Sequence, residues 1–173
     1  MDGKVEVLSV AMDAQGPDRV RPYVEAAGVT FTTLIDSDNI LGQIYGFKAI
    51  PNGFLIDERG VVRYKKLGGF DIRRVETKAV LDRWVSGEDP APGRDWPVAG
   101  PEFSESNELF RQGMVPFRQG RVEEAVELWH AGLEHDPDNY IIRKQIWAIE
   151  HPGRFYEGDV DYTWQRAQIA DGP

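Results

Sequence analysis

The sequence predicts an α/β domain over residues 1–86, followed by an α-helical module and tail over residues 104–173. Two observations indicate this class. Short β-prone runs alternate with helical patterns in the first half, whereas apolar residues recur at helical spacing after residue 104. Between the two parts, residues 87–103 hold four of the eleven prolines, a composition that predicts a semi-rigid, extended linker.

The chain begins with a predicted strand, helix and second strand. Lys4–Ala11 is rich in valine and is typical of a strand. The apolar residues of 20–27 recur at i, i+3, i+4 and i+7, so they share one helical face. Pro22 is expected near the first turn, where its missing N–H costs least, and Gly28 is expected to end the helix. Thr30–Ile35 is the second short strand.

A short helix and a hairpin are expected next. Ser37 and Asp38 offer cap oxygens to a helix over Asn39–Tyr45. Phe54–Asp57 and Val61–Leu67 are two β-prone runs, and the residues that join them end in a glycine, which is typical of a hairpin turn.

The last helix of the α/β domain is expected to follow a cap at Asp71. Its apolar residues are predicted to form one buried face: Ile72, Val75, Ala79 and Trp84. Trp96, in the linker, is expected to pack back on one of the two flanking parts, because an indole is costly to expose.

Three helices are predicted in the module. Ser104 or Ser106 can cap the first, and Gly120 ends its pattern. Arg121–His135 and Tyr140–Glu150 are the second and third helices. The residues expected to point inward from the second helix are Val122, Ala125, Val126, Trp129 and Leu133.

Composition excludes several classes of function. The net charge is −9, and residues 87–173 hold the whole acidic excess, which argues against binding to nucleic acid. No apolar run approaches the ~18 residues of a membrane span. The sequence as it stands shows no signal peptide, so we expect a cytoplasmic location for it.

The residue types that carry most metal and thiol chemistry are scarce. The sequence has no cysteine, which removes disulfides, thiolate metal sites and thiol nucleophiles together. His130 and His135 are five residues apart, about 140° around a helix, so we expect no metal site and no cofactor. Four aspartates at strand ends are explained by turns and caps better than by acid–base catalysis: Asp13, Asp36, Asp38 and Asp57.

The segment Ala49–Gly60, AIPNGFLIDERG, resembles the thioredoxin superfamily, most of all its TlpA/ResA branch near the alkyl hydroperoxide reductase family. The resemblance spans roughly residues 4–86. It implies that Pro51 is the proline that is usually cis in this family, and that Ile50, Pro51 and Asn52 dock an extended peptide. Asn52 departs from the Thr or Ser that is common at its position.

The same resemblance implies that a central strand and its helix, which carry the family's cysteine pair, are missing. That strand would lie between the strand equivalent to Val5–Ala11 and the strand Phe54–Asp57. Two strand edges would then be unpaired, and unpaired buried backbone is costly. We therefore expect a homodimer or higher oligomer in which the edges pair or exchange. The alternative is a monomer whose two edges join directly.

The helical module resembles a single tetratricopeptide repeat. Pro116 stands where the first helix usually has an aromatic residue, with Phe117 offset by one, and the proline should kink or weaken that helix. One repeat cannot bury its own face, so the module should pack on the first domain or on another chain. The residues at the repeat's small, aromatic and closing positions are Gly113, Gly120, Ala125, Trp129, Gly132 and Pro137.

Two functions fit these features. The first is a protein of thiol–disulfide oxidoreductase descent that is redox-inactive without cysteine and acts through protein contacts. The alternative is a piece of a TlpA/ResA-like oxidoreductase whose segment with Cys or selenocysteine lies outside this sequence. The polypeptide itself is not expected to be an enzyme, and the resemblance implies a family that usually works outside the cytoplasm.

Overall fold

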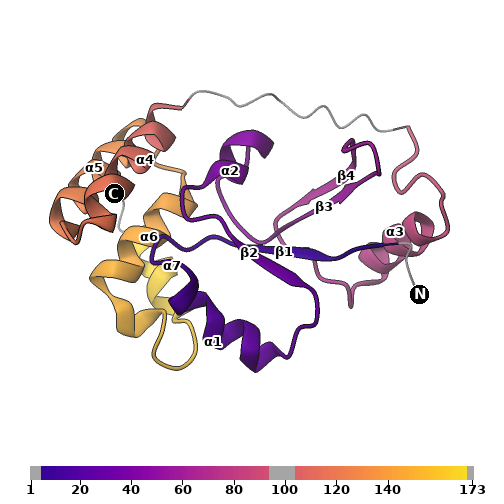
Figure 1. The fold of residues 1–173 in the computed structure, drawn as a ribbon, viewed down its shortest axis with the longest axis horizontal. Helices are drawn as coiled ribbons and strands as arrows, with labels where there is room; N and C mark the ends of the chain where they lie inside the picture. Colours follow the sequence, from indigo (N-terminus) through magenta and orange to yellow (C-terminus); the bar gives the residue numbers. More distant parts are fainter. Residues whose placement is uncertain (1–4, 94–103, 171–173) are drawn as a thin grey trace.

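The computed structural model describes residues 5–93 and 104–170, and it confirms a mixed α/β architecture. Short strands occupy the middle of the molecule in Figure 1, with a group of helices at one end and helix α3 (Val75–Val85) at the other. Trp96 and the rest of residues 94–103 lie outside the described residues, so the packing expected for that tryptophan stays a prediction.

The first strand, helix and strand form a parallel βαβ unit. β1 (Leu8–Ala11) pairs with β2 (Thr32–Ile35), with Leu8 opposite Thr32. Of the predicted strand Lys4–Ala11, Lys4 lies outside the described residues, and residues 5–7 have no partner in the ladder, so that β1 begins at Leu8. α1 (Pro17–Ala27) connects the two strands.

The position expected for Pro22 is wrong. α1 begins at Pro17, so Pro22 lies in the interior of the helix and not in its first turn. The helix begins before the apolar pattern does because a proline suits the first helical position, where no N–H is needed. Gly28 ends α1 in the left-handed conformation (φ 58°), as predicted.

The cap of α2 (Ile40–Tyr45) also differs from the prediction. The Asp36 carboxylate, and not Ser37 or Asp38, accepts the backbone N–H groups of Ile40 and Leu41, each at 2.8 Å. Asn39 takes a left-handed conformation just before the helix, and this bend brings Asp36 beneath the helix N-terminus.

The predicted hairpin is present. β3 (Asn52–Ile56) and β4 (Val62–Leu67) are antiparallel. Asp57 fixes the turn, because its carboxylate accepts the N–H of Val61 at 2.9 Å, and Gly60 supplies a positive φ of 80°.

The strands form two separate sheets. Over residues 5–93 and 104–170, β1 has a ladder only with β2, and β3 has one only with β4. The alternative in which the two edges join directly is therefore wrong for this part of the chain. Each of β1 and β3 keeps an edge with no strand beside it.

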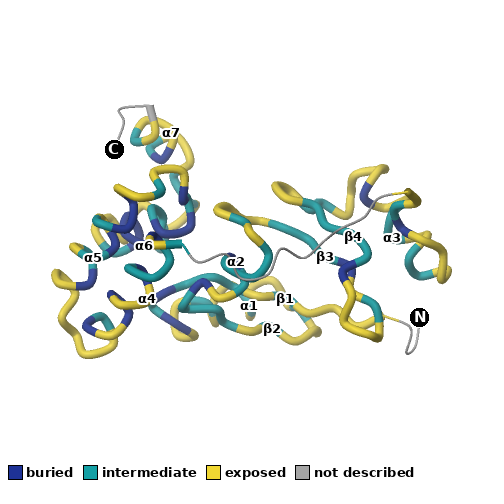
Figure 2. The backbone as a smooth tube through the Cα atoms, turned by 90° about the horizontal axis from the view of Figure 1, so that it is seen from above, coloured by how far each residue is buried: buried dark blue, intermediate teal, exposed yellow. Residues whose placement is uncertain are grey.

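The apolar face expected before and along α3 is not buried. Ile72 is 63% exposed and Val75 is 82% exposed. Asp71 does not cap α3; its carboxylate accepts the N–H of Arg73 at 3.0 Å in a turn that precedes the helix. Figure 2 shows the contrast between this exposed end and the buried segments of the helical group.

The second part of the chain is helical. α4 (Glu105–Arg118) and α5 (Val122–His135) pack along each other, and α6 (Tyr140–Glu150) packs on α5. A 3-10 turn (Pro152–Arg154) and α7 (Tyr162–Ala170) complete this part.

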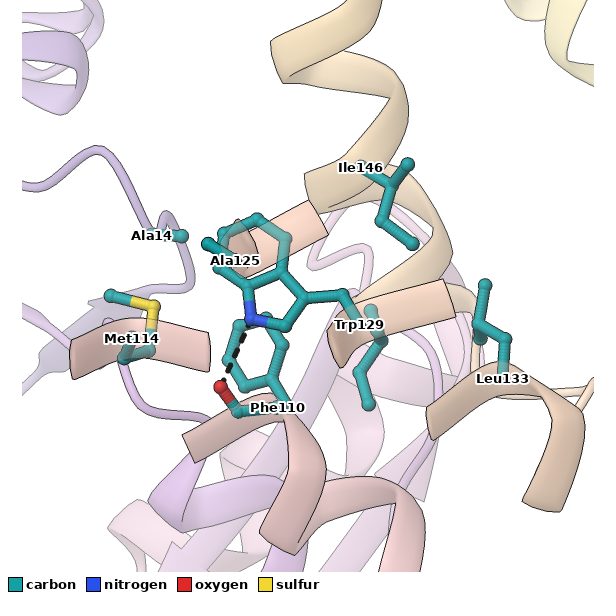
Figure 3. Close-up of a cluster of buried hydrophobic side chains, with 8 residues drawn as sticks. Ala14, Phe110, Met114, Ala125, Trp129, Leu133 and Ile146 are labelled. Atoms are coloured by element: carbon teal, nitrogen blue, oxygen red, sulfur yellow. Dashed lines mark hydrogen bonds between the residues drawn. The ribbon is translucent and has the colours of Figure 1, made fainter. Parts of the chain in front are cut away.

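The hydrophobic core lies among these helices. Trp129 and Phe110 are fully buried, and the indole N–H of Trp129 donates to the Phe110 carbonyl at 3.0 Å (Figure 3). The core cluster also includes Ala14, from the loop that follows β1. The remaining members of the cluster are Met114, Ala125, Leu133, Ile142 and Ile146.

Two details of the module differ from expectation. Val122 is 37% exposed because it is the first residue of α5 and lies beyond the buried face. Neither Ser104 nor Ser106 caps α4 with its side chain, and Ser106 lies buried inside the helix. Pro116 lies in the last turn of α4, which continues to Arg118, and its missing N–H leaves the carbonyl four residues before it without that helical donor.

Candidate binding pocket

An apolar face of the β1–β2 sheet is open to solvent. Leu8 and Val10 of β1 project to the same side as Leu34 of β2, because Val10 is opposite Leu34 in the register. These side chains are 53%, 38% and 48% exposed. A sheet face of this kind is normally covered by another layer. The open edge of β1 borders this uncovered face.

A pocket of about 390 Å³ lies where the segments next to β1 and β3 meet the helical module. Met12 and Asp13, which directly follow β1, line it together with Ile50, which precedes β3. The carboxyl end of β1 and the amino end of β3 therefore both lead to this pocket.

One face of α6 forms the opposite wall. The residues involved recur three and four positions apart, as one side of a helix requires: Tyr140, Ile141, Lys144, Gln145 and Ala148. The segment after α6 closes the pocket with Phe155, Tyr156 and Val160. The lining is mostly apolar, with a few polar groups, which is typical of ligand sites.

Polar groups of the pocket are paired across the two parts of the chain. The Tyr156 hydroxyl donates to the Asp13 carboxylate at 3.0 Å, and the Gln15 backbone N–H donates to the same carboxylate at 2.8 Å. Burial raises the pKa of Asp13 above the usual value, although these hydrogen bonds act in the other direction. Burial, followed by the Asp13 charge, raises the pKa of Tyr156.

Lys144 differs from these groups because its side-chain ammonium has no hydrogen-bond or ion-pair partner among the described residues. Its side chain is half-buried in the pocket wall, and this desolvation lowers the pKa of its ammonium group. An unpaired cation in a mostly apolar wall is costly unless an anion is bound to it.

The three residues predicted to dock a peptide have different surroundings. Ile50 is 46% exposed and lines the pocket, and its backbone N–H and C=O have no partner among the described residues. The Ile50–Pro51 peptide bond is cis. The Pro51 carbonyl accepts from Gly69 N–H, and the Asn52 side chain bonds Ala49 O and Gly68 N–H. The Asn52 side chain therefore links the loop before β3 to the residue that follows β4.

Two of the glycines predicted to let the helices approach, Gly113 and Gly132, lie where α4 and α5 contact each other closely. A β-carbon built on Gly113 would overlap the Trp129 indole, and one on Gly132 would lie 3.0 Å from the Ser106 carbonyl. Gly120 has a φ of 78° in the turn between α4 and α5. Ala125 is fully buried, and the Pro137 carbonyl accepts from the Arg143 guanidinium in the turn before α6.

The module packs on the first part of the chain, which was one of the two predicted possibilities. The Gln145 side-chain oxygen accepts the Ala14 N–H at 2.8 Å, and its amide donates to the Met12 carbonyl at 3.4 Å. The Ile141 N–H donates to the Lys48 carbonyl at 3.1 Å. These bonds hold the pocket together.

The other candidate groups have structural partners. Asp38 pairs with Arg118 at 2.8 Å, and His130 lies 3.4 Å from Glu150. In the described ranges, no group of three or more metal-binding side chains comes together, and no helix is long and apolar enough to cross a bilayer.

Sequence reasoning did not identify Lys144 or Tyr156 as pocket residues. Their only sequence signal is that a lysine and tyrosines occur among apolar residues at helical spacing in 140–148 and in the aromatic-rich tail. Which strand end they would meet depends on tertiary packing. No protein-family model matches the sequence, and no solved structure matches it at a significant level.

Proposed function

We propose that this chain is a thioredoxin-like interaction protein, redox-inactive as a cysteine-free polypeptide, which binds an extended strand of another polypeptide at the open edges of β1 and β3. The observation that carries the proposal is the pair of unpaired strand edges next to an exposed apolar sheet face. An added strand would receive main-chain hydrogen bonds from the edges, and its side chains would cover apolar surface.

The order and direction of the elements support the thioredoxin-like assignment. A parallel βαβ unit is followed by an antiparallel hairpin and a helix, and the residues that follow β1 line the same pocket as the residue Ile50 before β3. The close approach of α4 and α5 at Gly113 and Gly132 supports the likeness of the module to a tetratricopeptide repeat.

The first experiment measures association through the strand edges. A second copy is the simplest source of a strand, so light scattering on the purified chain is expected to give about twice the monomer mass of 19.6 kDa. Val10→Lys should shift the mass to the monomer, because a charge on the open face opposes edge pairing. Val115→Lys, at an exposed site on α4, is the matched control and should leave the mass unchanged.

A dimer that both substitutions leave intact would show that the contact lies elsewhere. A monomer for the unchanged chain would remove self-association, and binding of an added peptide would then decide whether the edges accept a strand at all. If the chain is monomeric and binds no strand peptide, the proposed function is wrong.

A second candidate is a thiol–disulfide oxidoreductase whose cysteine-bearing strand and helix are supplied from outside this sequence. The position of the pocket favours it, because a strand placed parallel to β1 would deliver its carboxyl end beside Asp13 and Ile50. The chain alone should not reduce insulin disulfides. Fusion of a strand–helix segment with Cys-x-x-Cys should confer reduction, and the same fusion with serines should not.

A further inference from the structure

The direction of a bound strand can be deduced from the ends of β1 and β3. Met12 and Asp13 follow β1 into the pocket, and Ile50 enters it just before β3. A strand that pairs with the open edge of β1 and reaches the pocket can run in one of two directions. If it is parallel to β1, its carboxyl end enters the pocket; in the opposite direction, its amino end does.

Charge in the pocket discriminates between these two directions. Two ionisable side chains of opposite charge line the pocket, Asp13 and Lys144. The lining also includes the neutral hydroxyls of Tyr23, Tyr140 and Tyr156. Asp13 already accepts two hydrogen bonds, from Gln15 and Tyr156. The Lys144 ammonium has no partner among the described residues, so the pocket can bind an anion through this group.

The walls around Lys144 favour an apolar residue next to that anion. Ile141 and Ala148 flank Lys144 on α6, and Ala49 and Ile50 face them from the loop before β3. The volume of about 390 Å³ is near the lower end of the ~300–1,000 Å³ of ligand sites, which suits the end of a peptide and not a folded element. The open backbone groups of Ile50 can bond the main chain of such a peptide.

We infer that the pocket binds the carboxyl end of an extended, apolar segment of a partner protein, with Lys144 paired to the terminal carboxylate. The inference rests on the proposed function, since the rest of the segment lies along β1 and β3. It adds the polarity of the segment and the chemical group at its end, neither of which strand pairing alone determines.

The test uses two peptides that differ at one group. Each is a six-residue peptide of alternating valine and threonine with a final leucine, labelled with fluorescein at its amino end. One carries a free carboxylate and the other a carboxamide. Fluorescence anisotropy with the full chain should show that the carboxylate form binds roughly tenfold to a hundredfold more tightly, the value of a charged hydrogen bond in a desolvated site.

Variants locate the effect. Lys144→Met should bind both peptides equally and weakly, whereas Lys144→Arg should retain the preference for the carboxylate. Lys78→Met, on exposed α3, is the matched control and should bind as the unchanged chain does. Circular dichroism of each variant checks folding, and the comparison of the two peptides on the unchanged chain needs no variant.

The outcomes are separable. Equal affinity of the unchanged chain for carboxylate and carboxamide would overturn the inference and leave strand binding in place. If the chain binds neither peptide, the inference is wrong, and so is the proposal that a peptide adds as a strand at the open edges. Peptide binding that appears only at dilutions where a dimer of the unchanged chain dissociates would assign the edges to a second copy, and it would overturn the partner-protein assignment.

Discussion

The strand region and the helical module differ in how much of their own apolar surface they bury. Leu8 and Val10 are 53% and 38% exposed, whereas Phe110 and Trp129 are fully buried. Each helix satisfies most of its backbone internally, so a few close contacts are enough to build a core. A strand relies on neighbouring strands for its backbone hydrogen bonds, and among the described residues each strand has a neighbour on one side only. The comparison teaches that apolar side chains on strands stay exposed where no further strand or layer covers them, whereas the paired helices bury theirs.

The largest expected effect is the loss of the central tryptophan. Trp129→Ala should lower the free energy of unfolding by about 3–5 kcal/mol, because it removes a buried ring together with its hydrogen bond to the Phe110 carbonyl. Leu34→Ala, on the exposed sheet face, should cost about 0.5 kcal/mol or less. Urea denaturation followed by circular dichroism measures both. Equal costs would mean that the strand region is buried in solution.

A smaller effect is expected where the two helices touch. Gly113→Ala should lower the free energy of unfolding by about 1–3 kcal/mol, because the new methyl group meets the Trp129 indole. Gly153→Ala is the matched control, since its new β-carbon lies at an ordinary 3.5 Å from Glu157. Thermal unfolding of the two variants tests this. A Gly113→Ala protein as stable as the control would show that α4 and α5 are further apart than described.

The junction between the two regions gives the next prediction. Gln145→Leu should cost about 1–3 kcal/mol, because the Ala14 N–H and the Met12 carbonyl lose their partner in a buried place. It should also speed proteolysis of the loop after β1. Gln112→Leu, on the exposed face of α4, is the control. If the loop is equally protected in both variants, the junction does not depend on Gln145.

The smallest effect is a pH dependence at Asp13. Burial raises its pKa in the folded state, so the folded chain binds this proton more tightly than the unfolded chain. The associated stability is complete below the usual aspartate range and is lost as the pH rises through the folded pKa. Asp13→Asn removes the titration, so its stability relative to the unchanged chain should rise with pH over that range. A difference that is independent of pH would contradict the raised pKa.

Local patterns predicted most of the elements. The bounds of α6 were predicted to the residue, and the turn at Gly120 and the hairpin before β4 follow from residue types that act within a few positions. The cap of α2 was predicted wrongly because the left-handed Asn39 lets a more distant carboxylate reach the helix. That effect depends on backbone geometry that side-chain preferences alone do not determine.

The candidate site was less predictable than the fold. Ile50 was predicted to contact a ligand, and the structure places it in the pocket wall. Lys144 was not predicted, because its place in the pocket depends on α6 packing beside the end of β1, and the hydrogen bonds that join these segments link residues 131 and 133 positions apart. The failure at Val75 has the reverse cause, since its helical pattern was correct but no surface of the described residues covers it.

The burial of Ala14 in the helical core means that the boundary in sequence is not the boundary in space. Residues 12–15 are stabilised by contacts with the helical part of the chain, which begins about ninety positions later. A break in the covalent chain between residues 93 and 104 therefore need not separate the two parts. Two fragments made as separate polypeptides have the contacts to reassemble. Such a pair of fragments would form a split protein, and a ligand that binds near the junction would change how readily the fragments reassemble.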